Sequence, residues 1–573
     1  MRRRDGEIEF DAPQFRSRAR MLTAVLGLVS IALLVRSVQL QVFDRQFFVE
    51  QGDMRHVRKA PMIAHRGTIV DRFGEPLAVS SPVDSVWVNP PVFADSGDGI
   101  AKLSGALKLN RQWLEQRVTS NLDREFLYVA RHLDPDKAAE IRKLGIPGVS
   151  FEREYKRFYP NGEVTAHLLG FTNLDEEGSE GLELAYDRSL AGKDGAKSVI
   201  QDGRGQVIQE VEVLKSPLQG EELQTSIDLR IQYLAYRELK AAMRNFHARA
   251  GTVIVLDIAS GEVLAMVNQP SFNPNDRMQF DLARLRNRAV TDIFEPGSSI
   301  KPFVVAAALA SGRYHANSTI DAMPFQVASH VIRDHHDLGT IGLGQVLALS
   351  SNVAMAKIAL SLDKSQMHDT LGDLGFGKVT DSGFPGESAG LLSSAQNWRP
   401  INVATMSYGY GLSVTPLQLA QAYATVGAFG VHRPITFRRV TEPPAGVRVI
   451  PAAVARELIS LLEGVVTTAG ATGAKAAVPG YRVAGKTGTA WKAVPGGYSK
   501  DRYVAVFGGV VPATEPRLAL LVMMDEPQGS LYYGGDVAAP VYSAVASGAL
   551  RLMSVAPDEL ARITPVNYAG VTQ

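Results

Sequence analysis

One apolar run near the N-terminus constrains this chain more than any other feature. Residues 21–35 are uncharged and mostly apolar, and residues 37–43 continue the run at lower hydrophobicity after Arg36. Because a long side chain near a helix end can reach the interface, residues 21–43 are long enough for one membrane-spanning helix. The arginine-rich residues 1–20 would stay in the cytoplasm, which places the rest of the chain on the other side of the membrane.

A cleaved signal peptide is the alternative, because its apolar region would be similar in length. No small-x-small cleavage site follows Val35, and no later stretch is long and apolar enough to return to the membrane. The sequence therefore favours an uncleaved, single-pass anchor.

The remainder of the chain has the composition of a globular protein. Of its 573 residues 45% are hydrophobic and 21% are charged, and this length predicts two or three domains. The net charge of +1 provides no strong basic field, which argues against nucleic acid as the main partner. Cysteine is absent, which excludes disulfides, thiolate metal sites and a cysteine nucleophile.

Two patterns follow the anchor. Up to about residue 220, short strands alternate with helical stretches, and a strand–turn–strand pattern surrounds Phe73-Gly74. His167 lies in an apolar run, where a histidine is more often structural than catalytic. After residue 226 the sequence predicts a helix at residues 228–246 and a hairpin, then mostly helices. Three strands follow, the first at residues 481–490, and a helix at residues 539–553 closes the chain. Strands at both ends with helices between them indicate an α/β sandwich whose two ends share one sheet.

A first motif in the second part suggests chemistry. Ser298 and Lys301 open an apolar run after a Pro296-Gly297 turn, so one helical turn brings the lysine amine beside the serine hydroxyl. A serine at a helix N-terminus with a half-buried lysine beside it is typical of an activated nucleophile. The spacing alone is weak, because Ser361 and Lys364 repeat it without any other sign of chemistry.

Two further motifs follow in order. Ser350 and Asn352 lie between two helical runs, from which a hydroxyl and an amide could project together into a cleft. Lys486-Thr487-Gly488-Thr489 ends a strand, where the glycine leaves room for a ligand backbone and the threonines supply hydroxyl groups. Each motif alone is common, but the ordered set in an anchored chain is specific.

This set resembles the class B penicillin-binding proteins, and most closely the division-type peptidoglycan transpeptidases (penicillin-binding protein 3 type) of Gram-negative bacteria. The likeness runs from the anchor to about residue 555. It includes Arg66-Gly67, Arg157, Gly181-Leu182-Glu183, Phe294-Glu295-Pro296-Gly297-Ser298, Tyr408-Gly409-Tyr410-Gly411 and Tyr532-Tyr533-Gly534-Gly535.

The resemblance implies an α+β fold with a transmembrane anchor, an elongated non-catalytic pedestal domain and a transpeptidase domain. In the last domain helices would sandwich an antiparallel sheet, as in β-lactamases. The implied bounds are a cytoplasmic tail at 1–20, the anchor at 21–43, the pedestal at 44–220, the transpeptidase domain at 221–560 and a flexible tail at 561–573.

The resemblance also implies a role for each motif. Ser298 would attack a stem peptide and form an acyl-enzyme, with Lys301 as the base and Ser350 as a proton relay. Backbone N–H groups of Ser298 and Thr489 would form the oxyanion hole. The implied substrate-binding residues are Asn352, Lys486, Thr487, Gly488, Thr489, Tyr503, Tyr532 and Tyr533. Ordinary sheet packing is the alternative for each of the three tyrosines.

No metal or cofactor is implied. The implied partners are stem peptides ending in D-Ala-D-Ala, β-lactams as covalent inhibitors, the inner membrane, and a SEDS-family glycosyltransferase with other divisome proteins. The catalytic domain would lie in the periplasm.

Three other interpretations remain. A β-lactamase or D,D-carboxypeptidase shares the three motifs but does not need the pedestal. A non-catalytic wall-binding scaffold or β-lactam sensor would keep the fold without its reaction. Leu349, Ala354 and the stretch at residues 335–339 depart from the family pattern, which leaves open a specialised paralogue.

Overall fold

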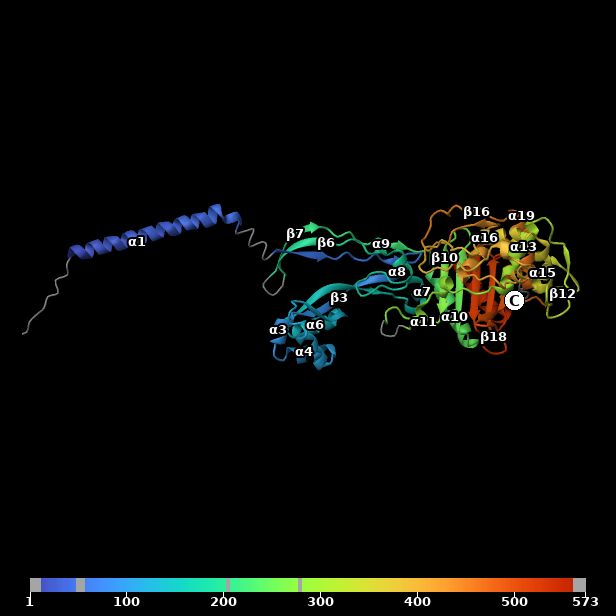
Figure 1. Cartoon of the computed structure of the whole chain (residues 1–573), viewed down its shortest axis with the longest axis horizontal. Coiled ribbons are helices and arrows are strands. Elements are labelled where there is room, and N and C mark those ends of the chain that lie inside the picture. Colours follow the sequence, from blue (N-terminus) through green and yellow to red (C-terminus); the bar gives the residue numbers. More distant parts are fainter. Residues whose placement is uncertain (1–11, 48–56, 202–206, 277–280, 560–573) are drawn as a thin grey trace, which may run out of the picture. The chain divides into compact units, whose positions relative to one another are not determined.

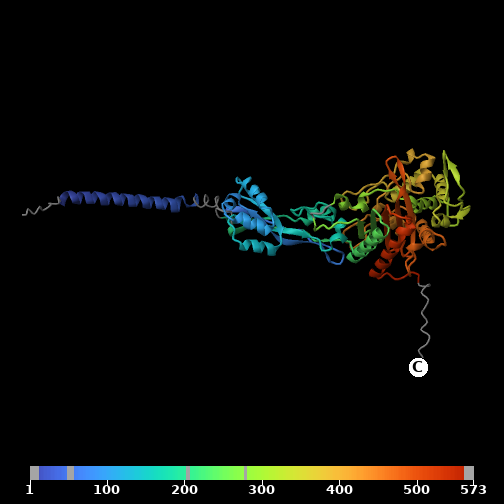
Figure 2. The ribbon, with the colours of Figure 1, turned by 90° about the horizontal axis from the view of Figure 1, so that it is seen from below.

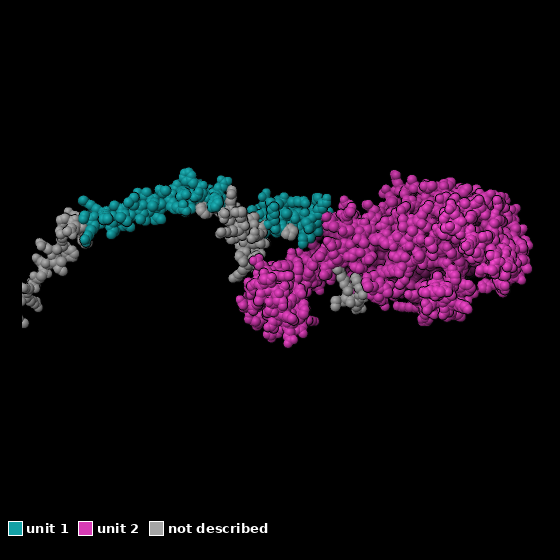
Figure 3. All heavy atoms as spheres, in the orientation of Figure 1, with its two compact units in different colours: residues 1–64, 193–219 teal, residues 65–192, 220–573 magenta. Residues whose placement is uncertain are grey.

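The chain forms two compact units. The computed structural model describes residues 12–47, 57–201, 207–276 and 281–559. One unit comprises residues 1–64 with 193–219, and the other comprises residues 65–192 with 220–573 (Figure 3). Of the two predicted tails, residues 1–11 and 561–573 lie outside the described part.

The first unit contains the apolar helix. Helix α1 (Ala12–Val38) continues into the π-helical turn η1 (Gln39–Phe43) (Figure 1). Within the described residues, Ser17–Phe43 is the single helical segment long and apolar enough to cross a membrane, and none of it is buried. This segment fits the predicted single-pass anchor. The unit is completed by an antiparallel three-stranded sheet in the order β1-β6-β7, formed by β1 (Val57–Met62), β6 (Gly195–Gln201) and β7 (Val207–Lys215).

The second unit begins with a sheet that carries small helices. Its strand order is β4-β3-β2-β8, and β5 pairs with β3. The strands are β2 (Ile69–Val70), β3 (Pro76–Val88), β4 (Leu127–Leu133), β5 (Val149–Phe158) and β8 (Leu223–Gln224). The helices are α3 (Pro90–Ala94), α4 (Gly99–Leu107), α5 (Arg111–Thr119), α6 (Pro135–Lys143), η2 (Gly162–Val164), α7 (Ala166–Leu169), α8 (Gly181–Ala185) and α9 (Asp187–Leu190). The predicted strands on either side of Phe73-Gly74 are confirmed as β2 and β3.

A buried ion cluster joins three distant segments of this region. Glu183 is fully buried and accepts hydrogen bonds from Arg66 Nε at 2.7 Å and from Arg157 Nε at 2.6 Å. Arg66 Nη1 also reaches Asp187 Oδ1 at 2.7 Å. Burial lowers the pKa of Arg66, but the two carboxylates outweigh it, so the pKa lies above its usual value. Because arginine stays charged, the buried carboxylate is what makes this arrangement tolerable.

One five-stranded antiparallel sheet organises the larger part of the second unit. Its order is β10-β9-β19-β18-β17, so strands from both ends of this region pair as predicted. The strands are β9 (Ala250–Asp257), β10 (Val263–Gln269), β17 (Ala484–Val494), β18 (Gly497–Val511) and β19 (Leu518–Asp525).

Both faces of this sheet are covered, which explains its continuous apolar strands. Val253 and Val255 pack in the core with α10 (Leu229–Asn245) and α21 (Ala539–Leu552). Ile254 and Leu256 point to the opposite face, in the core with α13 (Lys301–Ala310) and α18 (Pro416–Gly427). Successive strand residues face opposite sides, so both sets must be apolar when both sides are buried. The helical layers can be followed in Figures 1 and 2.

The remaining elements of this region are short or lie around the sandwich. The helices are α11 (Leu282–Leu285), α12 (Arg288–Thr291), η4 (Gly297–Ile300), α14 (Leu343–Ala348), α15 (Asn352–Ser361), α16 (Lys364–Asp373), η5 (Ala395–Asn397), α17 (Pro400–Met406), α19 (Ala452–Thr467), η6 (Ala474–Ala476) and α20 (Gly534–Val537). The strands are β11 (Thr319–Asp321), β12 (Phe325–Val327), β13 (His330–Ile332), β14 (Thr340–Gly342), β15 (Val431–His432) and β16 (Val447–Arg448).

His167 is a structural residue, as the sequence predicted. Its side chain is buried on α7, and its Nε2 lies 2.7 Å from the carbonyl oxygen of Arg284. Asn287 Nδ2 donates to the His167 carbonyl oxygen at 3.0 Å. Burial lowers the pKa of His167 to about 4, so the ring is neutral at neutral pH and joins α7 to the segment before α12.

Candidate active site

Ser298 lies on a tight turn that feeds a buried helix. It is the second residue of the 3₁₀ turn η4, which leads directly into α13. Gly297 before it has a φ of +53°, and a Cβ there would lie 2.9 Å from the carbonyl oxygen of Thr489. The turn is therefore packed against β17, which brings the backbones of Ser298 and Thr489, the two predicted oxyanion-hole residues, close together.

Gly488 shows the same close packing from the side of the strand. A Cβ at this position would lie 2.8 Å from the carbonyl oxygen of Pro296 and 3.0 Å from Ser299 Cβ. Residue 488 must therefore be a glycine because the turn that carries Ser298 packs directly against it. Approach of a ligand backbone, the reason inferred from the sequence, remains a prediction.

Lys301 points away from solvent toward the second motif. Its side chain is fully buried, and its Nζ donates to the Ser350 carbonyl oxygen at 2.6 Å and to Asn352 Oδ1 at 2.8 Å. Ser350 Oγ lies 3.2 Å from the same Nζ. Among the described residues no hydrogen bond joins Lys301 to Ser298, although both lie on one turn. A contact between the lysine amine and the Ser298 hydroxyl therefore remains a prediction.

Ser350 sits at the junction of two helices, as predicted. The junction separates α14 from α15, and Ser350 has a φ of +60°, a left-handed conformation that is uncommon outside glycine. Backbone strain of this kind persists where the surroundings hold it, often at functional sites. Here it places the Ser350 hydroxyl between two lysines.

Lys486 is the second of these lysines. It is fully buried on β17, and its Nζ donates to Ser350 Oγ at 3.0 Å and to the Thr487 carbonyl oxygen at 3.1 Å. The Ser350 hydroxyl therefore contacts both amines. The first and third motifs, which are far apart in the sequence, meet at this one oxygen.

Burial and like charge together set the protonation of the lysine pair. Burial lowers the pKa of Lys486 to about 7. Burial also lowers the pKa of Lys301 well below its usual value, and the neighbouring Lys486 lowers it further, while Asp334 opposes the shift. A buried lysine relieves its desolvation by losing a proton, and a neutral amine can act as a base.

The threonines of the third motif bond to neighbouring segments, and the three predicted tyrosines lie against one another. Thr487 Oγ1 donates to Thr472 Oγ1 at 2.7 Å, and Thr489 Oγ1 accepts from the Gly534 backbone at 3.0 Å. Tyr503 stacks on Tyr532 with ring centres 4.1 Å apart, and Tyr532 lies 4.4 Å from Tyr533. The three tyrosines thus form one continuous aromatic surface, whose contact with substrate remains a prediction.

Sequence reasoning missed Asp334 in the stretch between the first two motifs. Its Oδ1 accepts from the Asn352 backbone N–H at 2.6 Å, and its Oδ2 accepts from Ser351 Oγ. Asp334 therefore fixes the start of α15 and, through it, Asn352. Thr472 was missed too, and it bonds both Thr487 and the Ala348 backbone. Neither residue belongs to a local pattern, so only the fold reveals them.

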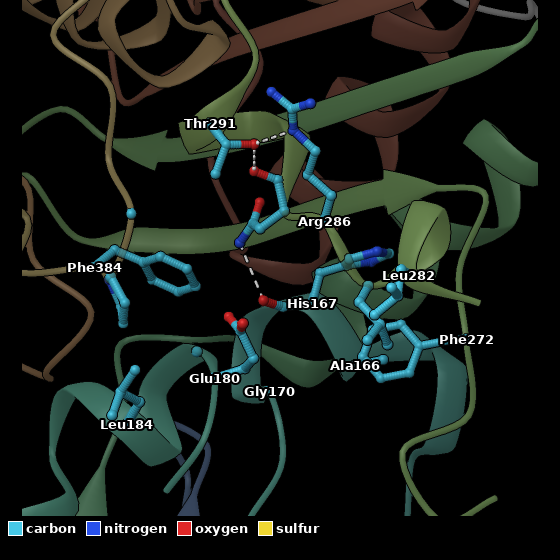
Figure 4. A pocket seen from close by; sticks show the side chains of 15 residues that line it. Ala166, His167, Gly170, Glu180, Leu184, Phe272, Leu282, Arg286, Thr291 and Phe384 are labelled. Atoms are coloured by element: carbon cyan, nitrogen blue, oxygen red, sulfur yellow. Dashed lines mark hydrogen bonds between the residues drawn. The ribbon is translucent and has the colours of Figure 1, made fainter. Parts of the chain in front are cut away.

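A cavity of about 480 Å³ lies elsewhere, between α7–α8 and the segment around α11 and α12 (Figure 4). Its lining includes His167, Leu184, Phe272, Arg286 and Phe384, and no residue of the motifs at 298–301, 350–352 or 486–489. It is therefore a separate hollow at a joint within the second unit. Among the described residues no group of histidines and carboxylates could hold a metal ion.

The fold and the site define a class of serine acyl-transfer proteins, and the comparisons with known proteins agree. The family model "Penicillin binding protein transpeptidase domain" matches residues 251–547, and "Penicillin-binding Protein dimerisation domain" matches residues 61–225. The chain belongs to the penicillin-binding protein transpeptidase family, in its class B, division-type branch.

Relatives with similar length support this assignment. The chain is 42% identical to peptidoglycan D,D-transpeptidase FtsI of Escherichia coli, over 95% of this chain and 93% of that protein. It is 41% identical to probable peptidoglycan D,D-transpeptidase PbpC of Pseudomonas aeruginosa, over 94% of this chain and 96% of the relative. A solved peptidoglycan synthetase from Bifidobacterium adolescentis has a TM-score of 0.69 and 25% identity, and the match covers 87% of this chain and 97% of that one.

Proposed function

We propose that the chain is a peptidoglycan D,D-transpeptidase that cross-links stem peptides at the division septum through an acyl-enzyme on Ser298. The observation that carries the proposal is the meeting of Lys301, Ser350 and Lys486 beside the turn of Ser298. A scaffold that only binds wall peptides would not need two buried lysines of lowered pKa.

In the first half-reaction Ser298 Oγ attacks the carbonyl of the penultimate D-Ala. A new ester bond forms, the peptide bond to the terminal D-Ala breaks, and free D-Ala leaves. Lys301 takes the hydroxyl proton, and Ser350 passes a proton to the departing amine. The contacts of Ser350 Oγ with Lys301 Nζ at 3.2 Å and Lys486 Nζ at 3.0 Å support this relay.

The geometry of Lys301 suits a base. A neutral amine has two N–H bonds and one lone pair. The two shorter contacts of Lys301, to the Ser350 carbonyl at 2.6 Å and to Asn352 Oδ1 at 2.8 Å, use both N–H bonds. The lone pair is then left for a hydroxyl proton.

Substrate binding falls to the groups around this centre. Lys486, Thr487 and Thr489 bind the terminal carboxylate of the donor or of a β-lactam, and Gly488 lets the strand lie close. Asn352 holds a donor amide, the N–H groups of Ser298 and Thr489 stabilise the oxyanion, and the aromatic surface forms a wall. The tyrosines expected to face the substrate are Tyr503, Tyr532 and Tyr533, whose stacking on one another supports a shared wall.

In the second half-reaction an amine of another stem peptide attacks the ester. A new amide bond forms, the ester bond to Ser298 breaks, and the serine regains its proton. Water in place of the amine would make the protein a D,D-carboxypeptidase, and β-lactams would block the site by acylating the same serine.

The proposal includes location and partners. The arginine-rich residues 1–20 remain in the cytoplasm, residues 21–43 cross the inner membrane, and the pedestal (44–220) and transpeptidase domain (221–560) lie in the periplasm. A SEDS-family glycosyltransferase and divisome proteins are the expected partners of the anchor and pedestal. Co-purification of the full chain from membranes tests this set.

Acylation of the full chain in detergent by fluorescent penicillin tests the reaction. We expect one adduct by intact mass, mapped to Ser298, and its loss in Ser298→Ala. Ser361→Ala is the matched control, because Ser361 has the same spacing to a lysine but bonds the Ile358 carbonyl. Label retained in Ser298→Ala, or lost in Ser361→Ala, would contradict the assignment.

Depletion in cells tests the septal role. Filamentation is the expected result, because unlinked septal wall cannot close. Normal septation would contradict the septal role and would indicate a paralogue that serves another growth condition.

A further inference from the structure

Glu295, three residues before Ser298, has one carboxylate oxygen that accepts hydrogen bonds and one that accepts none. Its Oε1 accepts from the Gly411 backbone at 2.8 Å and from the Tyr498 hydroxyl at 3.0 Å. Its Oε2 is shielded from solvent and has no hydrogen-bond partner. Native structures rarely leave a buried polar atom unpaired, and each case calls for a physical explanation.

Glu295 also lacks a cation. Several buried carboxylates of the second unit face an arginine or a lysine, as in Glu183 with Arg66, Asp84 with Arg153, Glu262 with Arg72 and Glu526 with Lys492. Among the described residues no ion pair includes Glu295, and burial raises the pKa of its carboxyl. The site therefore lacks a cationic hydrogen-bond donor.

The Glu295 carboxylate lies near the proposed nucleophile, Ser298. Three residues of chain span roughly 10 Å at most, so Glu295 stays near the Ser298 turn. Tyr498 reaches Glu295 from the start of β18, beside the β17–β18 turn, and its side chain is 47% exposed. Tyr498 is thus a half-exposed contact of this carboxylate, and a ligand can compete with it for a place there.

Cross-linking requires a second substrate with a primary amine, and an amine offers the cationic donor that Glu295 lacks. We propose that Glu295 holds the side-chain amine of the acceptor stem peptide, with Oε2 accepting its hydrogen bond once Tyr498 has moved aside. Glu295 then takes one proton from this ammonium, and the freed lone pair attacks the Ser298 ester carbonyl. The amide bond forms and the ester bond breaks, and the second amine proton goes to Ser298 Oγ. This inference rests on the proposed transpeptidase function and deepens it.

The test separates aminolysis from acylation in the full chain in detergent. A peptide thioester ending in D-alanine forms the acyl-enzyme, and mass spectrometry follows its release as acceptor is added. Two acceptors are compared: Nα-acetyl-L-lysinamide, a cationic primary amine, and hydroxylamine, a small nucleophile that is uncharged at neutral pH. The variants are Glu295→Gln, Glu295→Asp and Tyr498→Phe.

We expect Glu295→Gln to slow release by the lysinamide on the order of tenfold to a hundredfold, the usual value of a hydrogen bond to a charged group. Release by hydroxylamine and acylation by benzylpenicillin should not change. Glu295→Asp, which keeps the charge, should recover part of the loss. Tyr498→Phe removes one bond to the same carboxylate and should retain aminolysis.

Other outcomes overturn the inference. An equal loss with both acceptors, or a parallel loss of penicillin acylation, would make Glu295 a structural latch for Gly411. No loss at all would remove it from acceptor binding. If the lysinamide releases the wild-type acyl-enzyme and releases that of Glu295→Gln equally fast, this inference fails alone; if no acyl-enzyme forms, or if no amine shortens its life, the proposed transpeptidase function fails instead.

Discussion

Two buried clusters of basic side chains in the second unit balance their positive charge in opposite ways. Around Glu183 in the pedestal, two arginines close on one buried carboxylate at 2.6–2.7 Å. Around Ser350, two lysines are equally buried but contact only a serine hydroxyl and uncharged acceptors. The first cluster is neutralised by pairing, and the second is relieved by losing protons.

The choice of side chain follows from this difference. Arginine cannot give up its proton in a protein, so a buried arginine needs a carboxylate. Lysine can, and the pKa of Lys486 falls to about 7 because of burial. A paired buried charge is therefore typical of structure, and an unpaired buried amine is typical of chemistry.

The largest effect should follow from removing the base. Lys301→Met should slow acylation by benzylpenicillin about 10²- to 10⁴-fold, the usual contribution of a general base, while the chain still folds. Stopped-flow acylation and a thermal melt of the full chain measure both quantities. If Lys301→Met acylates at the wild-type rate, the lysine cluster has no chemical role that distinguishes it from the arginine cluster.

Breaking the Glu183 cluster of the pedestal should lower stability and leave the acylation rate unchanged. Glu183→Gln leaves Arg66 and Arg157 buried without their shared charge, which should lower the free energy of unfolding by about 3–5 kcal/mol. Acylation per folded molecule should stay at the wild-type rate. Denaturant unfolding measures the stability, and penicillin labelling measures the acylation rate. Glu387→Gln is the control, because native Glu387 bonds Thr380 and Ser382 rather than a cation. Slower acylation without loss of stability would contradict the structural role.

A smaller effect concerns His167, a buried base that is neutral at neutral pH. Its folded pKa of about 4 lies below the usual 6.5, so the unfolded chain binds more protons between these values. Stability is fully present above pH 6.5 and should fall by about 3 kcal/mol as pH drops to 4. His167→Gln should lose this slope, and the exposed His335→Gln should keep it. An unchanged slope in His167→Gln would show that the histidine is charged when folded.

Much of the sandwich could be predicted because its patterns are local. The helix predicted at residues 228–246 is α10 (Leu229–Asn245), and the predicted closing helix is α21. The strand predicted from Tyr481 begins at Ala484 instead, because boundaries depend on partners such as β18. Local periodicity predicts that an element exists more reliably than it predicts where the element begins and ends.

The site could be predicted only as separate motifs. The order of Ser298, Ser350 and Lys486 indicated a common site, but the meeting of Lys301 and Lys486 at the Ser350 hydroxyl depends on the tertiary fold. Asp334 and the vacant oxygen of Glu295 belong to no local pattern, so their roles emerge only from contacts across the fold.

The pH dependence of Ser298 acylation tests the central claim, that the buried lysine pair gives up a proton at neutral pH. The second-order rate constant for benzylpenicillin should fall as pH drops through the pKa of Lys301, because protonation removes the base. We predict that this acid limb lies well below the usual lysine value in the wild type and moves to higher pH in Lys486→Gln, where the neighbouring cation is gone. An acid limb near the usual lysine value, or one that Lys486→Gln does not move, would contradict the account.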